Sequence, residues 1–148
     1  MKFSTSIEYA VHALVFLSRS APGATVLLAD LARGITVPEG YLRKVSQQLA
    51  RRGLVVAQRG VRGGVALARK ADQITLRDVV EAIDGSLPSW SCLRTQRGCR
   101  VADPCVVKEA FDRATASMAR ELDGVTIADI AGKLGRKSAR WLPVGECA

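Results

Sequence analysis

The feature that most constrains the fold is a pair of predicted helices followed directly by a pair of predicted strands. The stretch VLLADLARGITVPEGYLRKVSQQLARRGLV predicts a short helix near residues 27–33, a turn at Gly34 and then a longer helix. Pro38 suits the first turn of the longer helix, and Gly53 suits its end. Two helices joined by a tight glycine-containing turn form a helix-turn-helix. The inner stripe of the longer helix would consist of Leu42, Val45 and Leu49.

Two β-prone runs, LVVAQ and VALAR, come next and are joined by the glycine-rich turn RGVRGG. A strand pair in this position is the wing of a winged helix. The turn lacks the Gly-Lys-Ser/Thr ending of a phosphate-binding loop and does not lead from a strand into a helix, so we expect no nucleotide site there.

Further helices are predicted on both sides of this unit. Thr5 and Glu8 have the spacing of a capping box, and apolar residues repeat behind them at helical intervals. Thr75 can cap a helix over roughly residues 76–84, and a short final helix begins at Thr126. The apolar stripe of the first helix would consist of Ile7, Ala10, Val11, Leu14 and Leu17.

A long amphipathic helix is predicted after the stretch that holds Cys92, Cys99 and Cys105. Its stripe is too apolar for a lone surface helix, so we expect it to pair with its symmetry mate. The predicted fold class is mainly α with a small β wing, a winged helix-turn-helix plus a long C-terminal dimerisation helix. The stripe consists of Val107, Phe111, Ala114, Met118 and Leu122.

Positive charge is concentrated in the first half of the chain. The 148 residues carry a formal net charge of +8, and residues 1–74 hold 11 Lys and Arg against 4 Asp and Glu, whereas residues 75–148 hold 11 against 10. This asymmetry indicates a polyanionic partner for the first half, although surface charge also serves solubility.

In a helix-turn-helix the second helix enters the major groove of DNA, and the wing reaches the backbone or the minor groove. Arg and Lys pair with guanine or phosphate, Gln pairs with adenine, and Thr binds phosphate oxygens. An ordinary solvated helix face is the alternative, but turn, wing and charge together favour double-stranded DNA as the partner. The residues placed to meet DNA are Thr36, Glu39, Tyr41, Arg43, Lys44 and Gln47, with Arg59 and Arg62 on the wing.

The N-terminal stretch MKFSTSIEYAVHALVFLSRS is apolar but is interrupted by Glu8, His12 and Arg19, and it lacks a small-residue cleavage site. No segment reaches the roughly 18 apolar residues of a membrane span. We therefore expect a soluble cytoplasmic protein with no membrane partner, in which thiols stay reduced.

Three of the four cysteines fall within the segment SCLRTQRGCRVADPCVVKE. Cys92, Cys99 and Cys105 are spaced C-x6-C-x5-C among turn formers and arginines, whose charge favours thiolates over thiols. Zinc sites usually show more closely spaced cysteine pairs, and an iron-sulfur cluster suits these thiolates at least as well. Three thiols without a cofactor, or a thiol switch, are the alternatives. Cys147 has no expected role.

The chain resembles the family of iron-sulfur winged-helix transcriptional regulators that includes IscR, NsrR and RirA. The resemblance lies in the segments YAVHAL, VPEGYLRKVSQQLARRGLV, RGVRGG, ITLRDVVEAIDG and DGVTIADI, together with the three-cysteine segment. It implies a homodimer joined through the long helix. It also implies a 2Fe-2S or 4Fe-4S cluster on Cys92, Cys99 and Cys105, with operator affinity that depends on the state of the cluster.

Three cysteines leave one coordination position of such a cluster open. IscR-like members supply a histidine three residues after the last cysteine, where this chain has Lys108. NsrR-like members use an acidic residue near the N-terminus of the partner subunit, and Glu8 stands where that residue would fall. His12 lies one helical turn further along the same face, so either side chain could complete the site. As structural alternatives, Glu8 would serve the capping box and His12 would pack in the subunit interface.

We therefore predict a homodimeric DNA-binding transcriptional regulator, acting as a repressor, whose operator affinity is switched by an iron-sulfur cluster that senses redox state, nitric oxide or iron. The alternative is a cluster-free regulator that uses its cysteines as a thiol switch. An enzyme with a cysteine nucleophile and His12 as its base is not expected, because the chain has one histidine and no pocket motif. The expected divisions are residues 1–85 for the winged helix-turn-helix domain, 86–106 for the cysteine cluster loop, 107–135 for the dimerisation helix and short final helix, and 136–148 for the tail.

Overall fold

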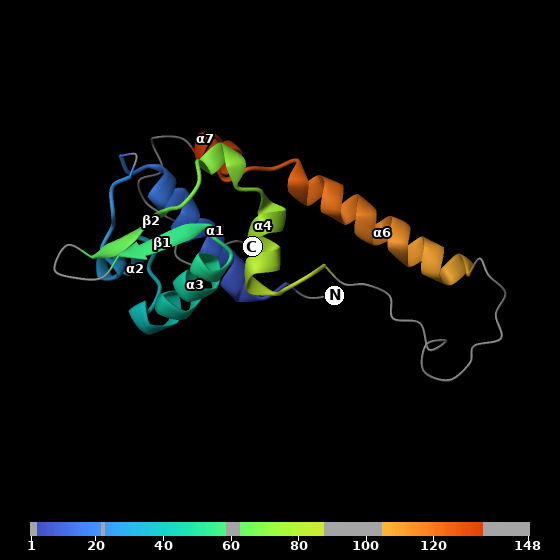
Figure 1. Ribbon diagram of the computed structural model, residues 1–148, viewed down its shortest axis with the longest axis horizontal. Coiled ribbons are helices and arrows are strands. Elements are labelled where there is room, and N and C mark those ends of the chain that lie inside the picture. Colours follow the sequence, from blue (N-terminus) through green and yellow to red (C-terminus); the bar gives the residue numbers. More distant parts are fainter. Residues whose placement is uncertain (1–2, 22, 59–62, 88–104, 135–148) are drawn as a thin grey trace.

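The computed structural model describes residues 3–21, 23–58, 63–87 and 105–134. These residues form six α-helices, a short 3-10 helix and a two-stranded antiparallel sheet (Figure 1). The fold class is confirmed as mainly helical with a small β wing. In chain order the elements are α1 (Thr5–Ser18), α2 (Leu28–Gly34), α3 (Glu39–Arg51), β1 (Val55–Gln58), β2 (Gly64–Leu67), η1 (Ala71–Gln73), α4 (Leu76–Ile83), α6 (Val106–Asp123) and α7 (Ile127–Lys133).

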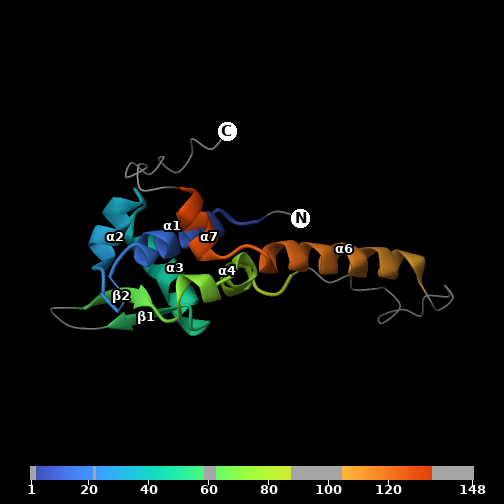
Figure 2. The same cartoon turned by 90° about the horizontal axis from the view of Figure 1, so that it is seen from above.

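Helix α1 lies at the centre of the body, and α2, α3, α4, α7 and β2 all pack against it (Figures 1 and 2). Burial of its apolar side chains stabilises the body by about 25 cal/mol per Å² of apolar surface removed from water. Ile7 and Val11 of the predicted stripe are only partly buried and pack against the edge of the core. The buried residues of α1 are Ala10, Ala13, Leu14, Val15 and Leu17.

The helix-turn-helix consists of α2 and α3. The predicted inner stripe of α3 is confirmed, because Leu42, Val45 and Leu49 are all buried. The turn lies later than predicted: Gly34 is the last residue of α2, and Thr36 has the left-handed conformation, with φ 57°. Gly34 is needed for packing instead, since a Cβ there would lie 2.4 Å from a ring carbon of Phe16 on α1.

The wing consists of β1 and β2, paired in a register that runs from Val55 opposite Leu67 to Gln58 opposite Gly64. Strand β2 is tied, near the turn end of the strand pair, to the chain just before α2. The backbone N–H and carbonyl groups of Val26 and Val65 exchange two hydrogen bonds of 2.9 and 2.8 Å. The orientation of the wing relative to α2 and α3 is therefore set by backbone contacts.

The start of α1 differs from the predicted capping box. The N-cap residue is Ser4 rather than Thr5, and no side chain caps the helix. The backbone N–H and the hydroxyl of Ser4 instead donate to the carboxylate of Asp84, at 3.0 and 2.5 Å. Glu8 is thus not engaged in a capping box, and the first residues of α1 are joined to the end of α4.

Two other predicted helix starts are confirmed. Thr75 and Asp78 form a capping box at the N-terminus of α4, and Thr126 and Asp129 form one at α7. In each box the threonine hydroxyl accepts from the backbone N–H three residues later, while the aspartate accepts from the threonine backbone. Both helix starts are therefore encoded locally.

Helix α7 returns to the body after the long helix. The backbone N–H of Ile127 donates to the carbonyl of Ile74, and that of Leu76 donates to the carbonyl of Val125, both at 2.9 Å. Ile127 is completely buried in the same core as α1. Helix α7, near the end of the chain, thus packs in the same core as the N-terminal helix α1.

Helix α6 projects from the body, with its C-terminal end next to α4 and its N-terminal end pointing away (Figures 1 and 2). None of its residues is buried. Arg77 of α4 donates to Asp123 at 3.0 Å, which holds the inner end of α6. Its outer half leaves apolar side chains exposed, with exposed fractions of 71% for Val106, 52% for Val107 and 47% for Phe111.

Candidate nucleic-acid interface and cysteine site

The surface of α3 opposite its buried stripe carries the predicted DNA-binding residues. Glu39, Arg43 and Gln47 follow one another at intervals of four residues and share one face, and all three are exposed. Lys44 is also exposed, on the flank of the same face. Thr36 is exposed in the turn before α3. This arrangement matches that of a recognition helix, whose first turns meet the base edges.

A groove of about 660 Å³ runs between α3, the start of α2 and the wing. Glu39, Arg43 and Gln47 line one side of it, and Gln58 at the end of β1 lines the other. Sequence reasoning missed Gln58, although its position at the last residue of β1, just before the glycine-rich turn, would have indicated it. Arg59 and Arg62 lie outside the described residues.

Two charged residues of α3, Glu39 and Arg43, form an ion pair within the helix. Arg43 Nη2 donates to Glu39 Oε1 at 2.7 Å, and both side chains remain substantially exposed, at 62% and 44%. An exposed pair of this kind is worth only about 0.2 to 1 kcal/mol, so it leaves the guanidinium free to turn toward a ligand.

Tyr41 has a different environment from the other predicted DNA contacts. Its hydroxyl forms a 2.5 Å hydrogen bond with the hydroxyl of Ser6, and its ring meets the ring of Tyr9 edge to face, with centroids 5.2 Å apart. Both partners lie on α1. Tyr41 therefore joins the recognition helix to the central helix, and a contact with DNA is a prediction for this residue.

Glu8 and His12 are both half-buried on α1. Burial lowers the pKa of His12, and the nearby charge of Glu8 partly opposes this effect. The imidazole is therefore neutral at pH 7, which is the form that binds metals. Glu8 also borders a mainly apolar hollow of about 380 Å³ together with Leu122, at the inner end of α6.

Cys105 is the N-cap residue of α6, with a half-buried free thiol. The 18 residues of α6 span about 27 Å, so Cys105 and the Glu8 hollow lie at opposite ends of the same helix. Cys92 and Cys99 lie outside the described residues. Within the described part of the chain, no three His, Cys, Asp or Glu side chains come close enough to hold a metal ion.

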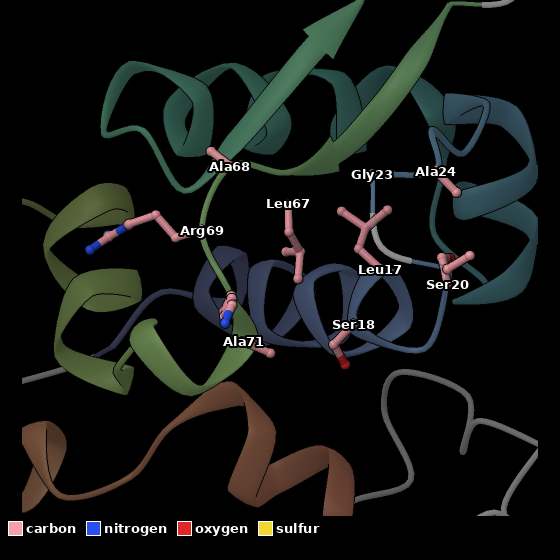
Figure 3. A pocket seen from close by; sticks show the side chains of 11 residues that line it. Leu17, Ser18, Ser20, Gly23, Ala24, Leu67, Ala68, Arg69 and Ala71 are labelled. Carbon is pink, nitrogen blue, oxygen red and sulfur yellow. The ribbon is translucent and has the colours of Figure 1, made fainter.

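Another hollow of about 380 Å³ lies between the end of α1 and the segment after β2 (Figure 3). Leu17 and Leu67 form its apolar walls. Arg69 is at its rim, but the guanidinium is paired with Asp78 of α4 at 3.4 Å. This hollow shares no lining residue with the groove along α3, and we assign no DNA contact to it.

The fold and the basic exposed helix define a winged helix-turn-helix DNA-binding protein. Residues 3–133 match the Rrf2 family model, described as iron-dependent transcriptional regulator. The chain belongs to the Rrf2 family of DNA-binding transcriptional regulators. None of the described helices is long and apolar enough to cross a membrane.

Solved structures share this fold over most of their length. CymR (YrzC), the global cysteine regulator of B. subtilis, is 24% identical with a TM-score of 0.73, and the match covers 90% of this chain and 98% of CymR. IscR from T. potens is 28% identical with a TM-score of 0.70, over 91% of this chain and 89% of IscR. The oxidized form of S. aureus CymR is 23% identical with a TM-score of 0.67, over 88% and 96%.

Proposed function

We propose that this protein is a homodimeric, operator-binding repressor whose DNA affinity is controlled by an iron-sulfur cluster. Cys92, Cys99 and Cys105 of one subunit would hold the cluster, and Glu8 or His12 of the other subunit would complete it. The bound cluster would supply iron that reacts with oxidants or nitric oxide. The similarity to IscR and the description of the matched family support this assignment.

The observation that carries the proposal is the placement of Cys105 and Glu8 at opposite ends of α6. A helix with no buried residue and an exposed apolar outer half needs a partner. If two copies of α6 pair in antiparallel fashion about a twofold axis, the outer end of one lies beside the inner end of the other. Cys105 of one subunit then approaches Glu8 and His12 of the other subunit. Within one chain, Cys105 and Glu8 lie at opposite ends of α6.

The chemistry of these donors fits a cluster. Cysteine thiolates are the usual ligands of iron-sulfur clusters, and Cys105, the N-cap residue of α6, carries a free thiol. His12 is held neutral by burial, and Glu8 is an oxygen donor one helical turn away. A carboxylate or imidazole is a harder ligand than a thiolate, so this position would be the most easily displaced.

A thiol switch without a cluster is the second candidate. The likeness to CymR, for which an oxidized form has been solved, favours it. In that case the three thiols themselves would change oxidation state, and operator affinity would follow their oxidation rather than iron content.

Anaerobic purification tests the two candidates. The cluster predicts a coloured protein with near-stoichiometric iron and sulfide, and Cys92→Ala, Cys99→Ala and Cys105→Ala should each abolish the colour and change operator affinity. Cys147→Ala is the matched control and should do neither. A colourless protein whose operator affinity still responds to oxidants would overturn the cluster and support the thiol switch.

The fourth ligand is tested separately with Glu8→Ala and His12→Ala. The variant that removes the true ligand should hold a more labile or spectrally shifted cluster, while the other should match the wild type. Two variants with wild-type spectra and stability would show that the ligand lies elsewhere, and the proposed link between the subunits would fail.

A further inference from the structure

An acidic residue on the recognition helix needs an explanation. Glu39 is the only acidic residue of α3, in the half of the chain where Lys and Arg outnumber Asp and Glu by 11 to 4. It is the first residue of the helix, which is the part that a helix-turn-helix brings closest to the bases. A carboxylate there repels DNA phosphates and so opposes binding unless it makes a favourable contact.

The surroundings of Glu39 show what such a contact would be. Its side chain borders the groove between α3 and the wing, together with Arg43, Gln47 and Gln58. Its Oε1 accepts from Arg43 Nη2 at 2.7 Å. A carboxylate has about four acceptor sites and a guanidinium five donors, so each group keeps most of its capacity for a second partner.

We propose that Glu39 is a specificity-determining residue that reads cytosine. In this inference, its free acceptor sites receive the N4 amino group of a cytosine, while it holds Arg43 against the O6 and N7 atoms of a neighbouring guanine. The inference rests on the proposed contact of α3 with operator bases, and it is independent of the cluster.

The chemistry of the base edges favours cytosine. In the major groove, cytosine presents only a donor, whereas guanine presents two acceptors that a carboxylate would repel. Thymine presents an acceptor and a methyl group, and adenine presents an acceptor beside its donor, which suits an amide better than a carboxylate. A carboxylate thus discriminates in favour of cytosine and against the other three bases.

A purely structural role for Glu39 is the competing explanation, because an acidic residue in the first turn interacts favourably with the helix dipole. Asp30 provides a matched control for that role. It lies in the first turn of α2, is exposed, and forms a 3.1 Å ion pair with Arg33. It is absent from the residues that line the groove.

The test is selection of bound sequences from randomised duplex DNA by the full-length wild type, Glu39→Gln and Asp30→Asn. The wild type should select one cytosine per half-site, preferred over other bases by roughly 5- to 150-fold. Glu39→Gln should lose this preference and move toward adenine at that base pair alone, since an amide pairs with adenine. Asp30→Asn should select the wild-type sequence.

Glu39→Ala extends the test, because it should lose the cytosine preference without gaining adenine. If Glu39→Gln and Glu39→Ala select the same sequence as the wild type and merely bind all DNA more tightly, Glu39 acts only through its charge and the inference is wrong. A wild type that selects no sequence at all would overturn the proposed operator binding itself, and this inference with it.

Discussion

At the scale of single residues, Thr36 stands out because it adopts a left-handed conformation that a β-branched side chain rarely takes. The conformation costs about 1 to 2 kcal/mol relative to the right-handed one. Backbone strain of this kind persists where the surrounding structure imposes it and is common at functional sites. Thr36 is exposed two residues before Pro38, the N-cap of α3, and we predict that its hydroxyl binds a phosphate oxygen of DNA.

Replacing Thr36 should therefore move stability and DNA affinity in opposite directions. Thr36→Gly should raise the free energy of unfolding by about 1 kcal/mol, because glycine adopts a positive φ without steric cost. The same variant should bind DNA more weakly, since the hydroxyl is lost. Thr36→Ala is the control: it lacks the hydroxyl but keeps a Cβ, so affinity should fall without the gain in urea-unfolding stability. If the Thr36→Gly protein is no more stable than the Thr36→Ala protein, the backbone at Thr36 is not strained.

Asp129 gives stability that depends on pH. Hydrogen bonds from the side chain and backbone of Thr126 lower the pKa of its carboxyl. The folded state therefore binds fewer protons than the unfolded state near this pKa, and the stabilisation is present at neutral pH and lost as pH falls through the folded pKa.

Asp129→Ala should consequently be less stable than the wild type at pH 7, and the difference should shrink below about pH 4, near the ordinary pKa of aspartate. Urea unfolding of both proteins across this pH range measures it. Asp72→Ala removes an exposed carboxylate from η1 and serves as the control. A difference that stays constant down to pH 3 would show that the capping box does not depend on ionised Asp129.

At the scale of elements, three contacts connect α1, α3 and the end of α4. Asp84, at the end of α4, accepts from Ser4 at the start of α1. Gln48 of α3 donates its side-chain amide to the carbonyl of Ile83 at 3.3 Å. The bond between Ser6 and Tyr41 joins α1 to α3. A displacement of α1 or of the end of α4 would therefore shift α3 as well.

The hydroxyl bond between α1 and α3 can be tested from both sides. Tyr41→Phe keeps the ring beside Tyr9 and loses only the hydroxyl, so it should lower the free energy of unfolding by about 0.5 to 1.5 kcal/mol. Ser6→Ala should cost a similar amount, and the double variant should lose no more than either single one. Operator affinity should change by the same amount in the two single variants, Tyr41→Phe and Ser6→Ala. If only Tyr41→Phe weakens operator binding, the hydroxyl contacts DNA directly.

Helix α6 is expected to be the dimer contact. Val107→Asp places a charge on its exposed apolar half, at a side chain that is 52% exposed on a helix with no buried residue. The variant should therefore fold but sediment as a monomer with weakened operator binding. Val56→Asp, at a similarly exposed valine of β1, should remain dimeric. A dimeric Val107→Asp protein would place the subunit contact elsewhere.

At the scale of the whole molecule, the uneven charge distribution should govern how binding responds to salt. The logarithm of DNA affinity should fall with the logarithm of salt concentration, with a slope of about −0.9 for each phosphate neutralised. Arg59→Ala and Arg62→Ala should each flatten this slope. Arg113→Ala, on the outer half of α6, should leave it unchanged. An affinity independent of salt would contradict the predicted phosphate contacts.

Much of the helical structure could be predicted from the sequence, because the signals are local. The capping boxes at Thr75 and Thr126 need only residues three positions apart, and the buried stripe of α3 follows from its helical repeat. The exposed positions of Arg43 and Gln47 follow from the same repeat. The family resemblance, rather than any spacing, supplied the iron-sulfur interpretation.

Contacts between distant segments were decided only by the tertiary structure. Thr5 and Glu8 have a capping-box spacing, yet the N-cap residue of α1 is Ser4, which is bound to Asp84, 80 residues away. Glycine is typical of turns, but Gly34 lies inside α2. A Cβ at this position would come too close to the ring of Phe16 on α1. Local sequence determines which helices form and which face is apolar. Only the packing of those faces decides where α1 starts, where the turn before α3 falls, and that Cys105 and Glu8 lie at opposite ends of α6.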